Sequence, residues 1–211
     1  IVSYLWLMPI AAFVILGCSG SRMTNSGLDD QDYFSGIAWT MYHSGNYLLP
    51  KLNGILYPDK PPILFWAMNA AWRLLGVNVF SIQLLTGGLI AIWIVLLRQT
   101  YKVVFPQDTL GSLLFPFLFV SLYQLWSEFY LLRVDLFLVI AVSLYNLIVL
   151  SASKNKCVNL LSLLGAIVAT TLGVFSKGPI FFVFSLLPLI LFTVFDRKSV
   201  FLYLKIMLST L

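Results

Sequence analysis

Apolar residues run almost without interruption through this chain, in stretches long enough or nearly long enough to cross a bilayer. The stretches cover residues 4–19, 80–97, 110–126, 134–150, 158–175 and 180–195, and a seventh begins near residue 200. A transmembrane helix needs about 20 apolar residues to cross a hydrocarbon core of about 30 Å. Only 10% of the residues are charged, against about 25% in soluble domains. The chain is therefore predicted to be an all-α, polytopic membrane protein.

The two ends of the sequence lead us to expect a longer protein. Residue 1 is an isoleucine rather than a start methionine, and the last apolar run stops at Leu211. That run holds roughly a dozen residues, too few to cross the core at about 1.5 Å per residue. We therefore expect residues 1–211 to be the N-terminal part of a larger transmembrane domain.

Pairs of positive charges follow the second, fourth and sixth apolar runs. The pairs are Arg98 with Lys102, Lys154 with Lys156, and Arg197 with Lys198. Short loops rich in Lys and Arg stay on the cytoplasmic side of a membrane. The rule therefore places the alternate segments on the outer face, namely residues 20–79, 127–133 and 176–179.

The two cysteines give no support to a disulfide or to redox chemistry. Cys157 is predicted to lie on the cytoplasmic side and Cys18 on the other, so the two cannot be bridged. The segment 15–18 is also similar to the cleavage site of a bacterial lipoprotein signal. We prefer a first membrane helix to this alternative, because five further apolar runs follow and no basic segment precedes it.

Residues 29–66 form the only long polar stretch, and their pattern predicts two surface helices. Aromatic and apolar residues recur at near-helical spacing from Tyr33 to Tyr42 and stop at Ser44-Gly45-Asn46. A pair of prolines, Pro61 and Pro62, opens the second helix, Ile63 to Leu75. Helices rich in aromatic residues can also rest on a membrane surface as a scaffold without any catalytic role.

The connection between these two helices is predicted to be an irregular crossover, residues 47–57, with a turn at Asn53-Gly54. The single histidine, His43, lies on the aromatic face of the first helix, and we interpret it as structural.

Three aspartates, Asp29, Asp30 and Asp32, stand at the start of the polar stretch. Carboxylates this close repel one another unless a cation, a basic side chain or a substrate shares their site. Three roles fit them: a helix N-cap, a site for a divalent metal, or a catalytic carboxylate. The residues alone leave these three open.

Further charged residues stand at predicted helix ends on the same side of the membrane. Lys60 precedes a helix start, where a cation opposes the helix dipole and favours an external anion. Arg133 and Asp135 begin the fourth run, and Lys177 ends the fifth. Ionisable groups at membrane depth are functional candidates. The alternatives are that Arg133 merely pairs with Asp135 or Glu128, and that Lys177 reaches for lipid headgroups.

These residues together resemble a known family of enzymes. The motifs that carry the resemblance are Asp30-Gln31-Asp32-Tyr33-Phe34, Ser44-Gly45-Asn46-Tyr47, Leu52-Asn53-Gly54, Asp59-Lys60-Pro61-Pro62, Arg133-Val134-Asp135 and Ser176-Lys177-Gly178-Pro179. They are similar, in order and spacing from about residue 28 to 195, to the GT-C membrane glycosyltransferases of the protein O-mannosyltransferase type. Within that family they most resemble the bacterial 4-amino-4-deoxy-L-arabinose lipid A transferases.

The resemblance implies transfer of a sugar from a polyprenyl-phosphate carrier to lipid A, another envelope glycan or a protein, on the outer face of a bacterial inner membrane. It implies that Asp30 is the catalytic carboxylate and that Lys60 faces the carrier phosphate. The family has Asp-Glu where this chain has Asp30-Gln31. Asp29, Asp32 and Asp135 are therefore candidates for a second carboxylate.

The chemistry of the residues agrees with this implication. Lys60, Arg133 and Lys177 can hold a leaving phosphate, and one carboxylate can accept a proton from an attacking hydroxyl. Tyr57 and Asp59 are candidates for positioning the acceptor or the loop. The sequence has no nucleotide-binding fingerprint and no His/Cys metal set, and we expect no nucleic-acid partner. Two alternatives stay open, a lipid or anion transporter (flippase) and an inactive, truncated relative.

Overall fold

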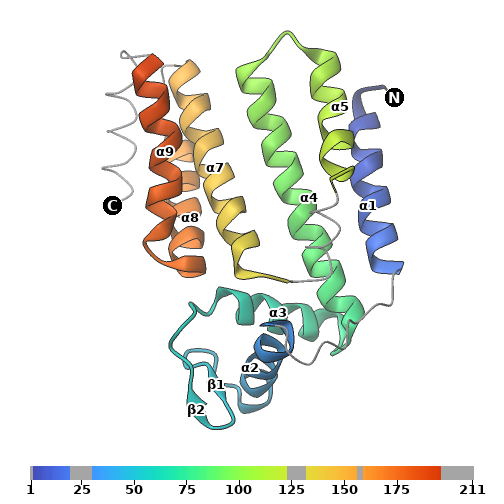
Figure 1. Ribbon diagram of the computed structural model, residues 1–211, viewed down its shortest axis with the longest axis vertical. Helices are drawn as coiled ribbons and strands as arrows, with labels where there is room; N and C mark the ends of the chain where they lie inside the picture. The colour runs from blue at the N-terminus through green and yellow to red at the C-terminus, as the bar shows by residue number, and fades with distance from the viewer. Residues whose placement is uncertain (1, 20–29, 123–131, 156–158, 196–211) are drawn as a thin grey trace.

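The structure is a computed structural model that describes residues 2–19, 30–122, 132–155 and 159–195 (Figure 1). The elements are a 3₁₀ helix (Val2–Leu7), α1 (Met8–Ser19), α2 (Asp30–Ser44), β1 (Lys51–Leu52), β2 (Ile55–Leu56), α3 (Ile63–Leu75), α4 (Val79–Val104), α5 (Thr109–Val120), α7 (Val134–Asn155), α8 (Leu160–Lys177) and α9 (Ile180–Phe195). The prediction of an all-α protein is confirmed, because the described strands form only one short hairpin.

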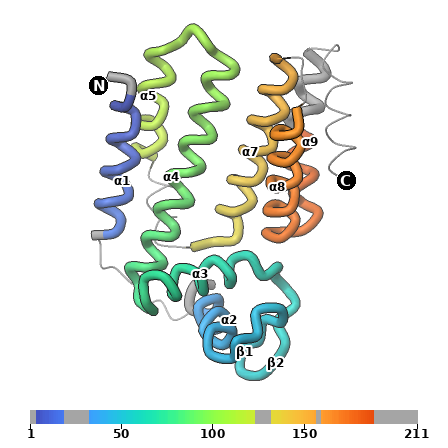
Figure 2. Tube along the Cα trace, turned by 180° about the vertical axis from the view of Figure 1, so that it is seen from behind, coloured from blue at the N-terminus to red at the C-terminus, as the bar shows by residue number. Residues whose placement is uncertain are grey.

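The helices form an upright bundle with a second layer across one end. In Figures 1 and 2, α1, α4 and α5 make one side of the bundle and α7, α8 and α9 make the other. The α2–α3 layer, which comprises α2, α3 and the β1–β2 hairpin, covers the end where α4 and α7 begin and α8 stops. Buried Ile90 and Ile94 of α4 join α1 and α7 in one core, whereas Phe181 of α9 lies in a second core with α7 and α8.

Three of the described helices are long and apolar enough to cross a membrane: α4, α7 and α8. Helix α4 runs on to Val104, seven residues past the apolar run from which it was predicted, and Arg98, the first residue beyond that run, is buried against the bundle. Helix α5 has 12 residues and ends at Val120, so it is shorter than the predicted run 110–126. Residues 123–126, and the last predicted run from residue 200, lie outside the described residues.

A proline inside α5 explains how Arg98 is held. Pro116 has no backbone N–H, so the carbonyl of Ser112 one turn earlier loses its helical donor. Arg98 Nε donates to that carbonyl at 2.8 Å. The Arg98 guanidinium also lies 4.1 Å from the centre of the Trp6 ring. One side chain therefore ties together the start of the chain, α4 and α5.

A tight corner joins α8 to α9. Gly178 ends α8 with a φ of 69°, a conformation that favours glycine, and its N–H donates to Val174 O at 2.8 Å. Phe181 then folds back over Gly173, where an added Cβ would lie 2.0 Å from the ring. The corner therefore depends on a glycine at both positions.

The α2–α3 layer has its own buried core, and the prediction of two helices in this segment is confirmed. The buried side chain of Asn69 on α3 donates to the carbonyl of Ala38 on α2 at 3.1 Å. The prediction of an irregular crossover over residues 47–57 is wrong for the middle of that segment, where β1 and β2 pair antiparallel. Asn53 and Gly54 both have positive φ, 51° and 83°, as the turn of a two-residue hairpin requires.

Replacing Gly173 with alanine is expected to lower the stability of the protein, because the methyl group has no space beside Phe181. We expect a loss of about 1–3 kcal/mol from overpacking. The control is Gly88→Ala, at a glycine of α4 where an added Cβ meets nothing within 4 Å. Alanine at position 88 should leave the stability unchanged or raise it by up to about 1 kcal/mol. Thermal unfolding in detergent measures both, and equal melting temperatures for the two variants would contradict this account of the corner.

Candidate functional site

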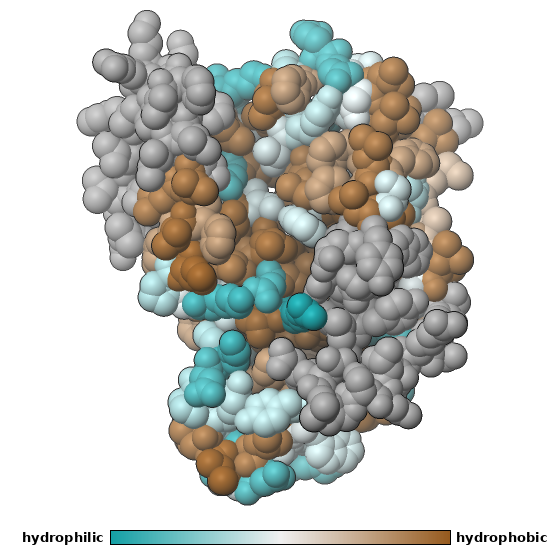
Figure 3. Space-filling view, in the orientation of Figure 1, coloured by the Kyte–Doolittle hydropathy of each residue, from teal (hydrophilic) through white to brown (hydrophobic). Residues whose placement is uncertain are grey.

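Charged residues from distant parts of the sequence lie on elements that come together at the end of the bundle that the α2–α3 layer covers. Lys60 precedes α3, Asp135 is the second residue of α7, and Lys177 is the last residue of α8. Hydrophilic side chains gather in a band where the bundle meets this layer (Figure 3). The described structure thus has a polar zone at one end of an apolar bundle.

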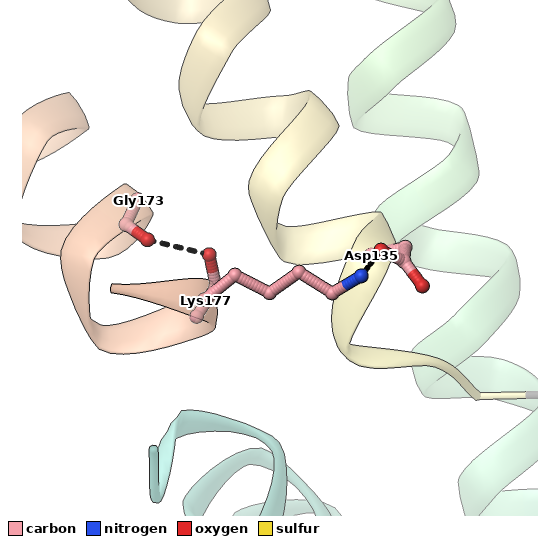
Figure 4. A network of polar contacts seen from close by, with 4 residues as sticks. Asp135, Gly173 and Lys177 are labelled. Carbon is pink, nitrogen blue, oxygen red and sulfur yellow. Dashed lines mark hydrogen bonds and ion pairs between the residues drawn. The ribbon is translucent and has the colours of Figure 1, made fainter. Parts of the chain in front are cut away.

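Asp135 and Lys177 form an ion pair between α7 and α8 (Figure 4). Each charge also suits its own helix, since Asp135 lies in the first turn of α7 and Lys177 in the last turn of α8. The side chains keep 55% and 32% of their surface exposed. An exposed pair contributes only about 0–1 kcal/mol to folding. The pair therefore orients two accessible charges rather than holding the bundle together.

The backbone around Lys177 is fixed on both sides. Ser176 is fully buried, and its hydroxyl donates to the Gly173 carbonyl at 2.7 Å. The helix stops one residue after Lys177, at Gly178. Because the flanking backbone is held, the lysine projects from a defined point beside the start of α7 (Figure 4).

Helix α3 docks against the same end of α8. The Trp66 ring lies 5.8 Å from the Phe175 ring, and the Trp66 indole N–H donates to the Tyr47 carbonyl at 2.6 Å. Trp66 follows Lys60 by six residues, so this contact brings the segment that carries the lysine to the α8 end of the bundle. Lys60 itself is half-buried.

The start of α3 is electropositive for a second reason. Its N-cap is Pro62, which makes no side-chain cap, and its first turn has no acidic residue. The free N–H groups of the first turn and the helix dipole therefore favour an anion there, beside Lys60.

Tyr57 connects this segment to the start of α2. Its ring lies 5.3 Å from Tyr33 of α2 and 6.4 Å from Phe65 of α3, and its N–H donates to Pro50 O at 2.9 Å. Asp59, two residues on, is exposed. The aromatic contact places the first turn of α2, which begins at Asp30, next to the segment that leads to Lys60.

The remaining predicted site residues are placed only in part. Asp30 is the first residue of α2 and Asp32 follows in the same turn, but their side chains lie outside the description, as do Asp29 and Glu128 entirely. Arg133 precedes α7 and is exposed. Among the side chains that the structure describes, no group of three His, Cys, Asp or Glu residues could hold a metal. His43 lies against the Trp39 ring, with 3.8 Å between ring centres.

The prediction from sequence did not single out Arg73, a basic residue of this layer. Arg73, in the last turn of α3, donates to the Tyr47 hydroxyl at 2.5 Å and lies 5.2 Å from the centre of its ring. An arginine in the last turn of an otherwise apolar predicted helix was the available signal. Its partner could not be chosen without the fold.

Comparison with known proteins gives a partial similarity to a sugar transferase. No protein-family profile matches the chain, and no solved structure does. An aligned region of 75 residues, 36% of this chain and 14% of the relative, is 29% identical to the undecaprenyl phosphate-alpha-4-amino-4-deoxy-L-arabinose arabinosyl transferase of Pseudomonas savastanoi pv. phaseolicola. A second region of 79 residues, 36% of this chain and 15% of the relative, is 28% identical to an uncharacterized protein of Aquifex aeolicus. The aligned part spans 14% and 15% of the length of these relatives.

The contact between Trp66 and the 47–57 segment can be tested by Trp66→Phe. Phenylalanine keeps a ring beside Phe175 but loses the hydrogen bond to Tyr47, which is worth about 1 kcal/mol. Amide hydrogen exchange in residues 47–57 should become about fivefold faster. Trp39→Phe is the matched control, because the Trp39 indole makes no hydrogen bond within the described residues. Unchanged exchange in Trp66→Phe would show that ring packing alone holds the segment.

Proposed function

We propose that this chain belongs to a membrane glycosyltransferase that moves a sugar from a polyprenyl-phosphate carrier to an acceptor at the end of the bundle covered by the α2–α3 layer. One observation carries the proposal: Asp135 and Lys177 pair across α7 and α8 at that end, where α3, preceded by the segment with Lys60, docks against α8. The partial similarity to an arabinosyl transferase that uses an undecaprenyl-phosphate sugar supports the same class of donor.

The donor requires positive charge around its leaving group. As the bond between the anomeric carbon and the phosphate oxygen breaks, negative charge builds on the carrier phosphate. Lys60 and the free N–H groups at the start of α3 supply one set of donors for it. Lys177 supplies a second, because a phosphate can compete with Asp135 for an exposed lysine. Arg133, at the head of α7, supplies the third.

The acceptor requires a carboxylate if it is a hydroxyl. Asp30 accepts the hydroxyl proton while the acceptor oxygen bonds to the anomeric carbon from the face opposite the phosphate. If the acceptor is an ionised phosphate, as on lipid A, no proton is removed and Asp30 stabilises positive charge on the sugar ring. Asp135, paired with Lys177, is better suited to positioning that lysine than to accepting the proton.

The position of the chemistry follows from the bundle. The carrier has a long apolar tail that remains in the bilayer, so its phosphate must be bound at a membrane surface. The exposed apolar faces of α8 and α9 that end near Lys177 suit such a tail, and they include Phe175, Ile180, Val183 and Phe184. We infer that this surface is the outer face of a bacterial inner membrane, in agreement with the positive charges at the opposite end.

Asp30→Asn in the full-length protein should lower sugar transfer about 10²–10⁴-fold, because asparagine can neither accept a hydroxyl proton nor stabilise positive charge on the sugar ring. Mass spectrometry of lipid A, other envelope glycans and surface proteins from cells expressing each form measures the product. Asp108→Asn, at the other end of the bundle, is the control and should retain transfer. Wild-type transfer by well-expressed Asp30→Asn protein would remove Asp30 from the mechanism.

Lys60→Gln should weaken the clamp on the carrier phosphate and lower kcat/KM for the lipid-linked sugar about 10²–10³-fold. Lys102→Gln, an exposed cation on the far end of α4, should leave it unchanged. Turnover of a polyprenyl-phosphate sugar by purified protein measures both variants. Equal losses in the two variants would mean that general surface charge, rather than Lys60, attracts the donor.

A further inference from the structure

Arg98 is a buried cation at the end of the bundle opposite the candidate site. Its residue surface is 8% exposed, and it makes no ion pair within the described residues. A buried charge without a counter-charge is costly. The proposed transferase chemistry gives it no role, and its contacts with Ser112 and Trp6 leave its charge unbalanced by any described carboxylate.

The neighbours of Arg98 use only part of its hydrogen-bonding capacity. A guanidinium has five N–H donors in a planar fork. The Ser112 carbonyl, freed by Pro116, accepts the hydrogen bond from Nε, and the Trp6 ring lies against the flat face of the guanidinium without accepting a hydrogen bond. The four donors on the terminal nitrogens have no acceptor among the described residues. That pair of nitrogens is the part of Arg98 that matches a phosphate.

The charges around Arg98 also favour an anion. Lys102 is exposed one turn further along α4, and Lys154 reaches across from α7 to the Val103 carbonyl. The one described carboxylate at this end, Asp108, is already engaged. The Tyr101 hydroxyl and the Gly111 N–H both donate to it and hold the pKa of that carboxyl below its usual range.

The depth of Arg98 in the bundle indicates a lipid rather than a free ion. Helix α4 has 26 residues, about 39 Å, so it exceeds a 30 Å core by about 9 Å. Arg98 precedes the end of the helix by six residues, again about 9 Å, and thus lies near the boundary between hydrocarbon and headgroups. Exposed apolar side chains surround this end of α4 and α5, including Val104, Phe105, Leu110 and Leu114.

We propose that Arg98 binds the phosphate of an anionic membrane lipid. The terminal nitrogens hold the phosphate oxygens, Trp6 covers the guanidinium face, and the exposed apolar residues of α4 and α5 contact the acyl chains. A bound lipid would then supply the counter-charge that Arg98 does not find among the described residues. It would also strengthen the junction of the chain start, α4 and α5. This site is independent of the transferase activity.

The first test uses the unmodified full-length protein with phosphatidylglycerol, phosphatidylcholine or inorganic phosphate in detergent. Phosphatidylglycerol should raise the melting temperature by about 3–6 °C and be retained preferentially in native mass spectrometry. Phosphatidylcholine and inorganic phosphate should do neither. Equal retention of the two lipids would overturn the proposal, and an equal shift with inorganic phosphate would reassign the site to a free anion.

The second test places the effect at Arg98. Arg98→Gln should abolish the shift caused by phosphatidylglycerol, and Arg98→Lys should keep roughly half of it. Arg73→Gln, at an exposed arginine on α3 at the opposite end of the bundle, should keep all of it. A full shift in Arg98→Gln would overturn the assignment. If Arg98→Gln does not fold, Arg98→Lys decides in its place, because loss of the planar fork must still lower lipid retention relative to Arg73→Gln.

Discussion

Hydrocarbon offers no hydrogen bonds to a protein backbone, and the architecture of this chain depends on that constraint. Each N–H and C=O at membrane depth must find a partner within the protein, so the spanning segments are helices. Where a helical backbone hydrogen bond is lost, a side chain can supply the missing donor. Pro116 leaves the Ser112 carbonyl without a donor, and Arg98 crosses from α4 to supply one. Polar side chains at this depth also pair with each other: the Trp93 indole on α4 donates to the Ser143 hydroxyl on α7 at 3.1 Å.

The same constraint explains why the charges lie where they do. Moving ionised groups into hydrocarbon is costly, so the described charges occupy helix ends and connections, with Arg98 the deepest. At one end, Asp135 and Lys177 pair across α7 and α8 beside the α2–α3 layer. At the other, Lys102, Lys154 and Asp108 surround the Arg98 junction. A bundle built in this way has two chemically different ends, one with an exposed pair of opposite charges and one where cations stand near a carboxylate that is already hydrogen-bonded.

Much of the fold could be predicted because short stretches of sequence, such as apolar runs, prolines and glycines, indicate where the helices lie and where they begin and end. The helix Ile63–Leu75 was predicted with the bounds it has in the structure, since prolines precede it and Gly76 ends it. The β1–β2 hairpin was missed although its Asn53-Gly54 turn was recognised. Its strands have two residues each, too few to show an alternating pattern. The exposed apolar residues Ile55 and Leu56 gave no periodic signal either.

By itself, the sequence determined the class of protein, the approximate helices and the list of charged candidates, because hydropathy, prolines, glycines and charge act over short stretches of chain. Only the tertiary structure decided which of those candidates meet. Lys177 pairs with Asp135 rather than merely reaching for headgroups, and Arg98 joins α5 through a carbonyl that a distant proline had freed. Such partnerships link residues 14 to 42 positions apart. They depend on how helices pack and where each one stops, which no local pattern encodes.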